Sequence, residues 1–151
     1  MPATIQGGPD GPQGSFVFGG VAVPAVIGLS DYPAAATPVT AASGNVAAAT
    51  ATATLAAGGS GITTYITGFQ VTGSGATAGL PVLVTVTNVV TGTLTYVYCA
   101  AAGVLVANTP LVVQFAKAIP ASAANTTIVV SCPSLGSGNT NNAVVAHGYQ
   151  L

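Results

Sequence analysis

Charged side chains are almost absent from this sequence. Only 2% of its 151 residues are charged, whereas a typical soluble domain carries about 25%. Asp10, Asp31 and Lys117 are the charged residues, and the net charge is −1 at pH 7. So small a charge creates no field that would attract nucleic acid or an anionic membrane surface. Nearly neutral proteins tend to associate. We therefore expect a surface covered by copies of the chain or by partner proteins, rather than a free, neutral surface of Thr, Ser, Asn and Gly.

Groups suited to acid–base or metal chemistry are equally scarce. The two carboxylates lie in a segment rich in Gly and Pro, which would not hold them a few ångströms apart on a rigid frame. No nucleophile-elbow motif precedes a helix. His147 is the single histidine, so a metal site would require several copies of it around a symmetry axis. We expect a protein that is not an enzyme and that uses no metal or cofactor.

Long hydrophobic runs and cysteine motifs are missing as well. Gly, Pro or Thr interrupts each apolar segment before the roughly 18 residues that a membrane span requires, and the apolar residues 16–29 lack the basic residues of a secretory signal. Cys99 and Cys132 lie in apolar runs without C-x-x-C spacing. We expect buried free thiols, or a disulfide if the two strands prove to be neighbours.

Residues 1–44 are rich in Gly and Pro, which interrupt both helices and strand ladders. The segment also contains large apolar side chains, which solvated linkers usually lack. The sequence thus predicts an extended N-terminal arm whose apolar residues lie in a groove of its own domain or of a neighbour. The candidate anchor residues are Phe16, Phe18, Val21, Val23, Val26, Ile27, Leu29 and Tyr32.

Residues 45–151 contain what the arm lacks, namely repeated alternation of apolar and polar residues with period two. Seven or eight short segments rich in β-branched and aromatic residues are separated by Gly, Pro, Asn and Ser. This pattern predicts an all-β domain, an antiparallel β-sandwich or a barrel. Residues 120–125 are the one place where a single helical turn is expected.

Three alternating stretches predict which side chains face the core. In residues 49–56, the threonines at 50, 52 and 54 form the wetter face, and the residues at 51, 53 and 55 face the core. A second stretch places Tyr65, Thr67, Phe69 and Val71 on one face. A third places Leu94, Tyr96 and Tyr98 together. Strand edges in such a chain would lack the Lys and Pro that normally prevent edge pairing, which suggests that partners occupy them.

Aromatic side chains allow one alternative role. Together with loop asparagines, four tyrosines would be able to line a shallow glycan site, although packing in the core or in an interface is the simpler explanation. These tyrosines are Tyr65, Tyr96, Tyr98 and Tyr149.

Two stretches of the sequence share motifs with a known group of proteins. They are residues 61–79 (GITTYITGFQVTGSGATAG) and residues 110–151, which run from PLVVQFAKAIPASAAN to NNAVVAHGYQL. The chain resembles, in these stretches, the small all-β virion structural proteins of tailed bacteriophages. The shared features are an I-P-A-S-A-A-N turn and a terminal G-N-T-N…H-G-Y-x-L strand, and the similarity covers about residues 45–151. It implies a jelly-roll-like sandwich that serves as a capsid decoration or cement subunit. A homotrimer bound to the major capsid protein or other virion proteins is expected, located in virions assembled in the host cytoplasm. The alternative is a head-fibre or tail component that binds host glycans.

Overall fold

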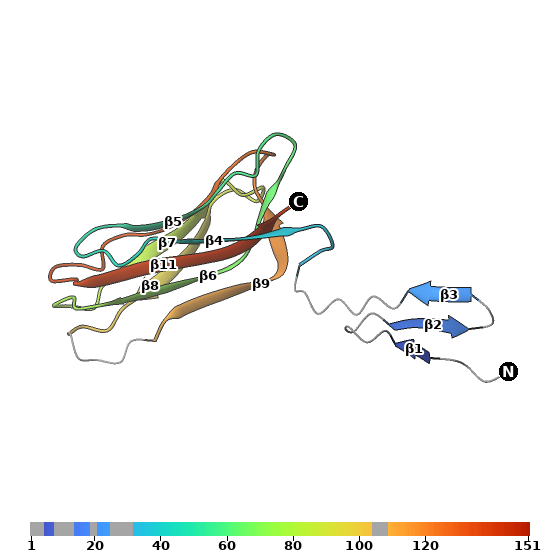
Figure 1. The fold of residues 1–151 in the computed structure, drawn as a ribbon. Helices are drawn as coiled ribbons and strands as arrows, with labels where there is room; N and C mark the ends of the chain where they lie inside the picture. Colours follow the sequence, from blue (N-terminus) through green and yellow to red (C-terminus); the bar gives the residue numbers. More distant parts are fainter. Residues whose placement is uncertain (1–4, 8–13, 19–20, 25–31, 104–108) are drawn as a thin grey trace. The chain divides into compact units, whose positions relative to one another are not determined.

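The computed structural model describes residues 5–7, 14–18, 21–24, 32–103 and 109–151 (Figure 1). Every regular element in these ranges is a β-strand, so the predicted all-β class is confirmed for them. The chain divides into two compact units, Met1–Pro33 and Ala34–Leu151. The first contains a three-stranded antiparallel sheet in the order β1-β2-β3. Its strands are β1 (Ile5–Gly7), β2 (Gly14–Phe18) and β3 (Val21–Pro24).

The second unit contains two four-stranded antiparallel sheets (Figure 1). One has the strand order β4-β11-β6-β9, and the other has the order β5-β10-β7-β8. The strands are β4 (Thr37–Ala42), β5 (Ala51–Leu55), β6 (Thr64–Ser74), β7 (Pro81–Thr87), β8 (Leu94–Cys99), β9 (Leu111–Pro120), β10 (Ile128–Cys132) and β11 (Asn141–Gln150). Only the connection from β7 to β8 joins neighbours in one sheet, and each other connection passes from one sheet to the other.

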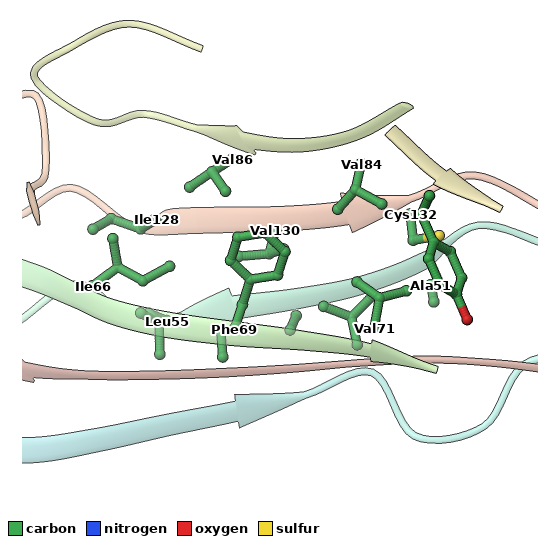
Figure 2. Close-up of a cluster of buried hydrophobic side chains, with 14 of the residues drawn as sticks. Ala51, Leu55, Ile66, Phe69, Val71, Val84, Val86, Ile128, Val130 and Cys132 are labelled. Carbon is green, nitrogen blue, oxygen red and sulfur yellow. The ribbon is translucent and has the colours of Figure 1, made fainter. Parts of the chain in front are cut away.

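The hydrophobic core lies between these two sheets (Figure 2). Phe69 and Ile66 from β6 meet Leu55 and Val130 from the opposite sheet, and all four are fully buried. The alternation predicted for residues 49–56 is confirmed, because Ala51, Ala53 and Leu55 are buried and the intervening threonines of β5 are exposed. In β8, Tyr98 is buried and Leu94 and Tyr96 pack against the core, as predicted.

A β-bulge in β6 overturns the prediction for its face. His147 of β11 pairs with Gly68, and the next residue, Gly148, pairs with Ile66, so Thr67 is an extra residue in β6. Because side chains alternate with period two, an inserted residue reverses the face of everything beyond it. Phe69 and Val71 therefore face the core, whereas Tyr65, which precedes the bulge, faces outward.

The strand β4 lies within the range predicted as the arm, residues 1–44, yet it pairs along its length with β11. The sandwich unit thus begins at Ala34 rather than at residue 45. Pro38 suggested a break in regular structure, but β4 is an edge strand, where a residue without an N–H is tolerated. The helical turn predicted at residues 120–125 is also wrong. The strand β9 runs to Pro120, Ala121 bridges Val89, and a turn follows.

Candidate interaction surface

The outer face of the β5-β10-β7-β8 sheet exposes a pair of large apolar side chains. Leu83 of β7 stands directly opposite Val97 of β8. They are 56% and 67% exposed, respectively, although side chains of this size gain about 1.5 to 3 kcal/mol from full burial. We call this the Leu83–Val97 pair. The flanking cross-strand pairs are Pro81 with Cys99 and Thr85 with Thr95.

Farther from β8, the same face is polar but uncharged. Thr52 and Thr54 of β5 are exposed, and the hydroxyl of Thr52 lies 3.4 Å from that of Ser131 on β10. Val129 of β10 stands between Thr54 and Thr87. No strand of this sheet contains a charged residue. The threonine stripe of β5 therefore belongs to a neutral surface that extends across all four strands.

The edges of the two sheets differ in their protection against pairing. The expectation that edge strands lack Lys and Pro is wrong for the β4-β11-β6-β9 sheet. Its edge strand β4 contains Pro38, and its other edge strand, β9, contains Lys117. The expectation holds for β5 and β8, the edges of the second sheet, which contain neither residue type. The Leu83–Val97 pair thus lies beside an unprotected edge.

The outer face of the β4-β11-β6-β9 sheet carries an aromatic pair instead. The rings of Tyr65 and Tyr149 stack with centroids 4.8 Å apart and planes 13° apart. Register places Pro38 beside Tyr149 and Pro120 beside Tyr65, so one row across four strands reads Pro, Tyr, Tyr, Pro. Burial, and secondarily the neighbouring Tyr65, raises the pKa of Tyr149. The site is closely packed, and Tyr149 is buried.

The four tyrosines considered for a glycan site do not come together. Tyr96 packs edge-on against Phe69 in the core, with centroids 5.2 Å apart. Tyr98 is buried, and desolvation is the main cause of its raised pKa. Tyr65 and Tyr149 are on the opposite sheet, facing outward. The structure therefore separates the set into two pairs on different faces.

His147 lies in the row next to the stacked tyrosines. It is half-buried, between Thr40 of β4 and Gly68 of β6, and its backbone carbonyl accepts a hydrogen bond of 3.1 Å from the Thr67 hydroxyl. Within the described ranges, no three His, Cys, Asp or Glu residues are grouped as metal ligands would be. No helix in the same ranges is long and apolar enough to span a membrane.

The two cysteines have different surroundings. Both thiols are free, and β7 separates their strands within the sheet, so the condition set for a disulfide is not met. Cys132 is buried as expected, and burial raises the pKa of its thiol to about 11. Cys99 is exposed on the outer face of β8, contrary to the expectation of a buried thiol. Side chains point alternately to the two faces of β8, so Cys99, which follows the inward-facing Tyr98, points outward.

The predicted anchor residues are only partly within the described ranges. Phe16 and Phe18 belong to β2, opposite Val23 and Val21 of β3. Tyr32 is half-buried. The other three, Val26, Ile27 and Leu29, lie outside the described residues.

Comparison with known proteins gives no relative for this chain. No family model, no curated protein and no solved structure matches it.

Proposed function

We propose that this chain is a non-enzymatic structural subunit of a tailed-bacteriophage virion, of the capsid decoration or cement type. Its role is to pack against copies of itself and against the major capsid protein or other virion proteins. The observation that supports this role best is the neutral outer face of the β5-β10-β7-β8 sheet, with the exposed Leu83–Val97 pair. A surface of this kind gains free energy when another protein covers it.

The sandwich is proposed to be a jelly roll. Jelly rolls contain eight strands in two sheets built from two Greek keys. Here the strands β4 to β11 number eight, and the sheet orders β4-β11-β6-β9 and β5-β10-β7-β8 place the first and last strands side by side. This order supports the proposal, as does the repeated crossing of the chain between sheets. The same architecture is common in capsid proteins.

The N-terminal unit is proposed to act as the anchor. A second contact through residues 1–33 would add to the contact made by the sandwich, because linking two weak interactions raises avidity without new chemistry. The alternative role, in a head fibre or tail that binds glycans, retains only Tyr65 and Tyr149 on an outer face. These two rings stack on each other, and Tyr149 is buried.

The copy number of the chain in purified virions tests the proposed role. Quantitative mass spectrometry against the major capsid protein should find hundreds of copies per particle, whereas a few to a few dozen would indicate a fibre or tail part. Absence from purified particles would contradict a virion role altogether.

Attachment is tested separately by co-sedimentation with undecorated heads. The full chain should bind, and a chain without residues 1–33 should remain folded by circular dichroism but bind weakly or not at all. Full occupancy by the shortened chain would show that the N-terminal unit is not the anchor.

A further inference from the structure

The outer edge of β8 presents an open backbone ladder. The strand β8 pairs with β7 on one side, and no other strand in the described parts of the chain pairs with its second side. Its six residues are rich in aromatic and β-branched types and include no Lys, Pro or Gly. Proteins normally protect such an edge, because its unpaired N–H and C=O groups act as a template for another strand.

We propose that two copies of the chain pair antiparallel along β8, about a two-fold axis that passes beside Val97. This inference rests on the proposed function only for its biological use, as the self-contact of the virion subunit. It makes a dimer the unit of self-association, in place of the trimer expected from the sequence. The two β5-β10-β7-β8 sheets would then join into one continuous sheet of eight strands.

The register follows from the alternation of side chains along β8. Thr95, Val97 and Cys99 face outward, and the residues between them face the core. A joined sheet keeps one buried face only if outward residues oppose outward residues. Pairing Val97 with its own copy satisfies this condition and places Thr95 opposite the second Cys99. It also produces an uninterrupted apolar row, in which Leu83 and Val97 of one copy continue into Val97 and Leu83 of the other.

A second copy is the partner that the charges favour. Lys117 is the only charged side chain in residues 34–151, and it lies on β9, in the other sheet. No like charges therefore oppose one another when two β8 edges approach, and no charge on β8 selects a differently charged partner. An antiparallel strand pair is self-complementary, so a closed two-fold contact results without further adaptation.

The other unprotected edge, β5, is less suited to this role. Its outward side chains are Thr52 and Thr54, which gain little from burial. The carbonyl that follows the strand, on Ala56, already accepts hydrogen bonds from the side chains of Thr64 and Gln150, at 2.9 and 2.8 Å.

The proposed contact is small. Five paired residues extend over roughly 17 Å at about 3.3 Å per residue. A single strand pair of this length buries less surface than the interfaces of about 1,600 Å² that hold stable dimers. The dimer should therefore form and dissociate with concentration in solution, and be fully populated only where copies are held close together.

Charge substitutions at Val97 test the two-fold axis directly. Analytical ultracentrifugation should show a concentration-dependent dimer for the natural chain. Val97→Lys and Val97→Glu should each weaken dimerisation by roughly tenfold or more, because two like charges then face each other. High salt should restore part of the loss for each variant. An equimolar mixture of the two variants should form a mixed dimer, since opposite charges then meet across the axis.

Val112 supplies the matched control. It is an exposed valine on β9, the edge strand that already contains Lys117. Val112→Lys and Val112→Glu should leave the dimer unchanged and show no effect on mixing. Circular dichroism should confirm that all four variants fold.

Three results would overturn the inference. These are a natural chain that remains monomeric at high concentration, a closed trimer or open-ended polymer, and a dimer that is indifferent to charge at Val97. Each concerns the purified chain alone, so each is distinguishable from failure of the proposed virion role, which is measured in particles.

Discussion

Replacing Asn142 by Asp is expected to destabilise the sandwich strongly while hardly changing its shape. Asn142 is fully buried in β11. Its side-chain nitrogen lies 3.2 Å from the carbonyl oxygen of Ala49, 3.3 Å from that of Cys132 and 3.0 Å from that of Pro133. The amide thus ties the residues before β5 and the end of β10 to β11.

The size of the effect follows from the number of N–H groups. The amide has two hydrogens for three acceptors, so it supplies about two full hydrogen bonds, worth about 1 to 3 kcal/mol together. Asp would lose these bonds and would place a carboxylate oxygen against carbonyl oxygens, away from water. Breaking a buried polar arrangement in this way costs a further few kcal/mol. We expect a total loss of at least about 3 kcal/mol at pH 7, a large part of the roughly 5 to 15 kcal/mol typical of a domain.

The loss should depend on pH in a definite direction. Burial and the surrounding carbonyls favour the protonated carboxyl, so the pKa of Asp at this position should be raised above the unfolded value of about 3.9. Below the unfolded pKa of about 3.9, the carboxyl is protonated in both the folded and the unfolded state and keeps one O–H donor, so the loss of stability is smallest. As pH rises toward the folded pKa, the unfolded state releases its proton first, and the stability of the variant falls relative to the natural chain.

Urea unfolding followed by circular dichroism at pH 4 and pH 7 measures both effects. Asn141→Asp is the matched control, because Asn141 is the adjacent residue and is exposed, so it should change stability by less than about 1 kcal/mol. An Asn142→Asp variant as stable at pH 7 as the control would refute the role assigned to the buried amide.

Three further predictions concern single positions. Gly148→Ala should lower the melting temperature markedly, since an added Cβ would overlap the backbone carbonyl of Tyr65 and overpacking costs about 1 to 3 kcal/mol; an unchanged melting temperature would contradict the close strand approach. A thiol reagent at pH 8 should modify Cys99 quickly and Cys132 only after unfolding, because Cys132 is buried with its pKa raised to about 11; equal native rates would contradict this difference. His147→Ala should cost only about 0.5 to 1.5 kcal/mol and leave assembly intact; lost assembly with normal stability would assign His147 a direct role.

The period-two alternation was sufficient to predict the all-β class and the inward faces of β5 and β8. In β5 the small residues and Leu55 face the core and the threonines face outward, as the sequence indicates. The inward face of β8 was also predictable, because both strands are regular. Alternation fixes the face of a strand only while the ladder continues without insertion.

The bulge at Thr67 is a feature that alternation alone did not predict. Gly68, an isolated glycine inside the strand pattern, is the one signal of a bulge in the sequence. Which residue is extra is visible only in the pairing of β11 with β6. The close approach at Gly148 likewise depends on a neighbour far away in sequence. Pro38 suggested a break, yet an edge position accommodates it.

The candidate interaction surface could not be predicted from the sequence, because it depends on the order of the strands in the two sheets. The sequence contains a single Lys, and only the pairing shows that it lies on an edge strand, β9, whose sheet has Pro38 on the opposite edge. The two protective residues are thus placed on one sheet, and the second sheet has none on either edge. The surface of this nearly neutral chain is therefore not equally suited to self-association on all sides. Its unprotected edges and its exposed Leu83–Val97 pair belong to the same sheet. The proposed pairing along β8 would therefore give one defined contact between copies, as the proposed assembly role requires.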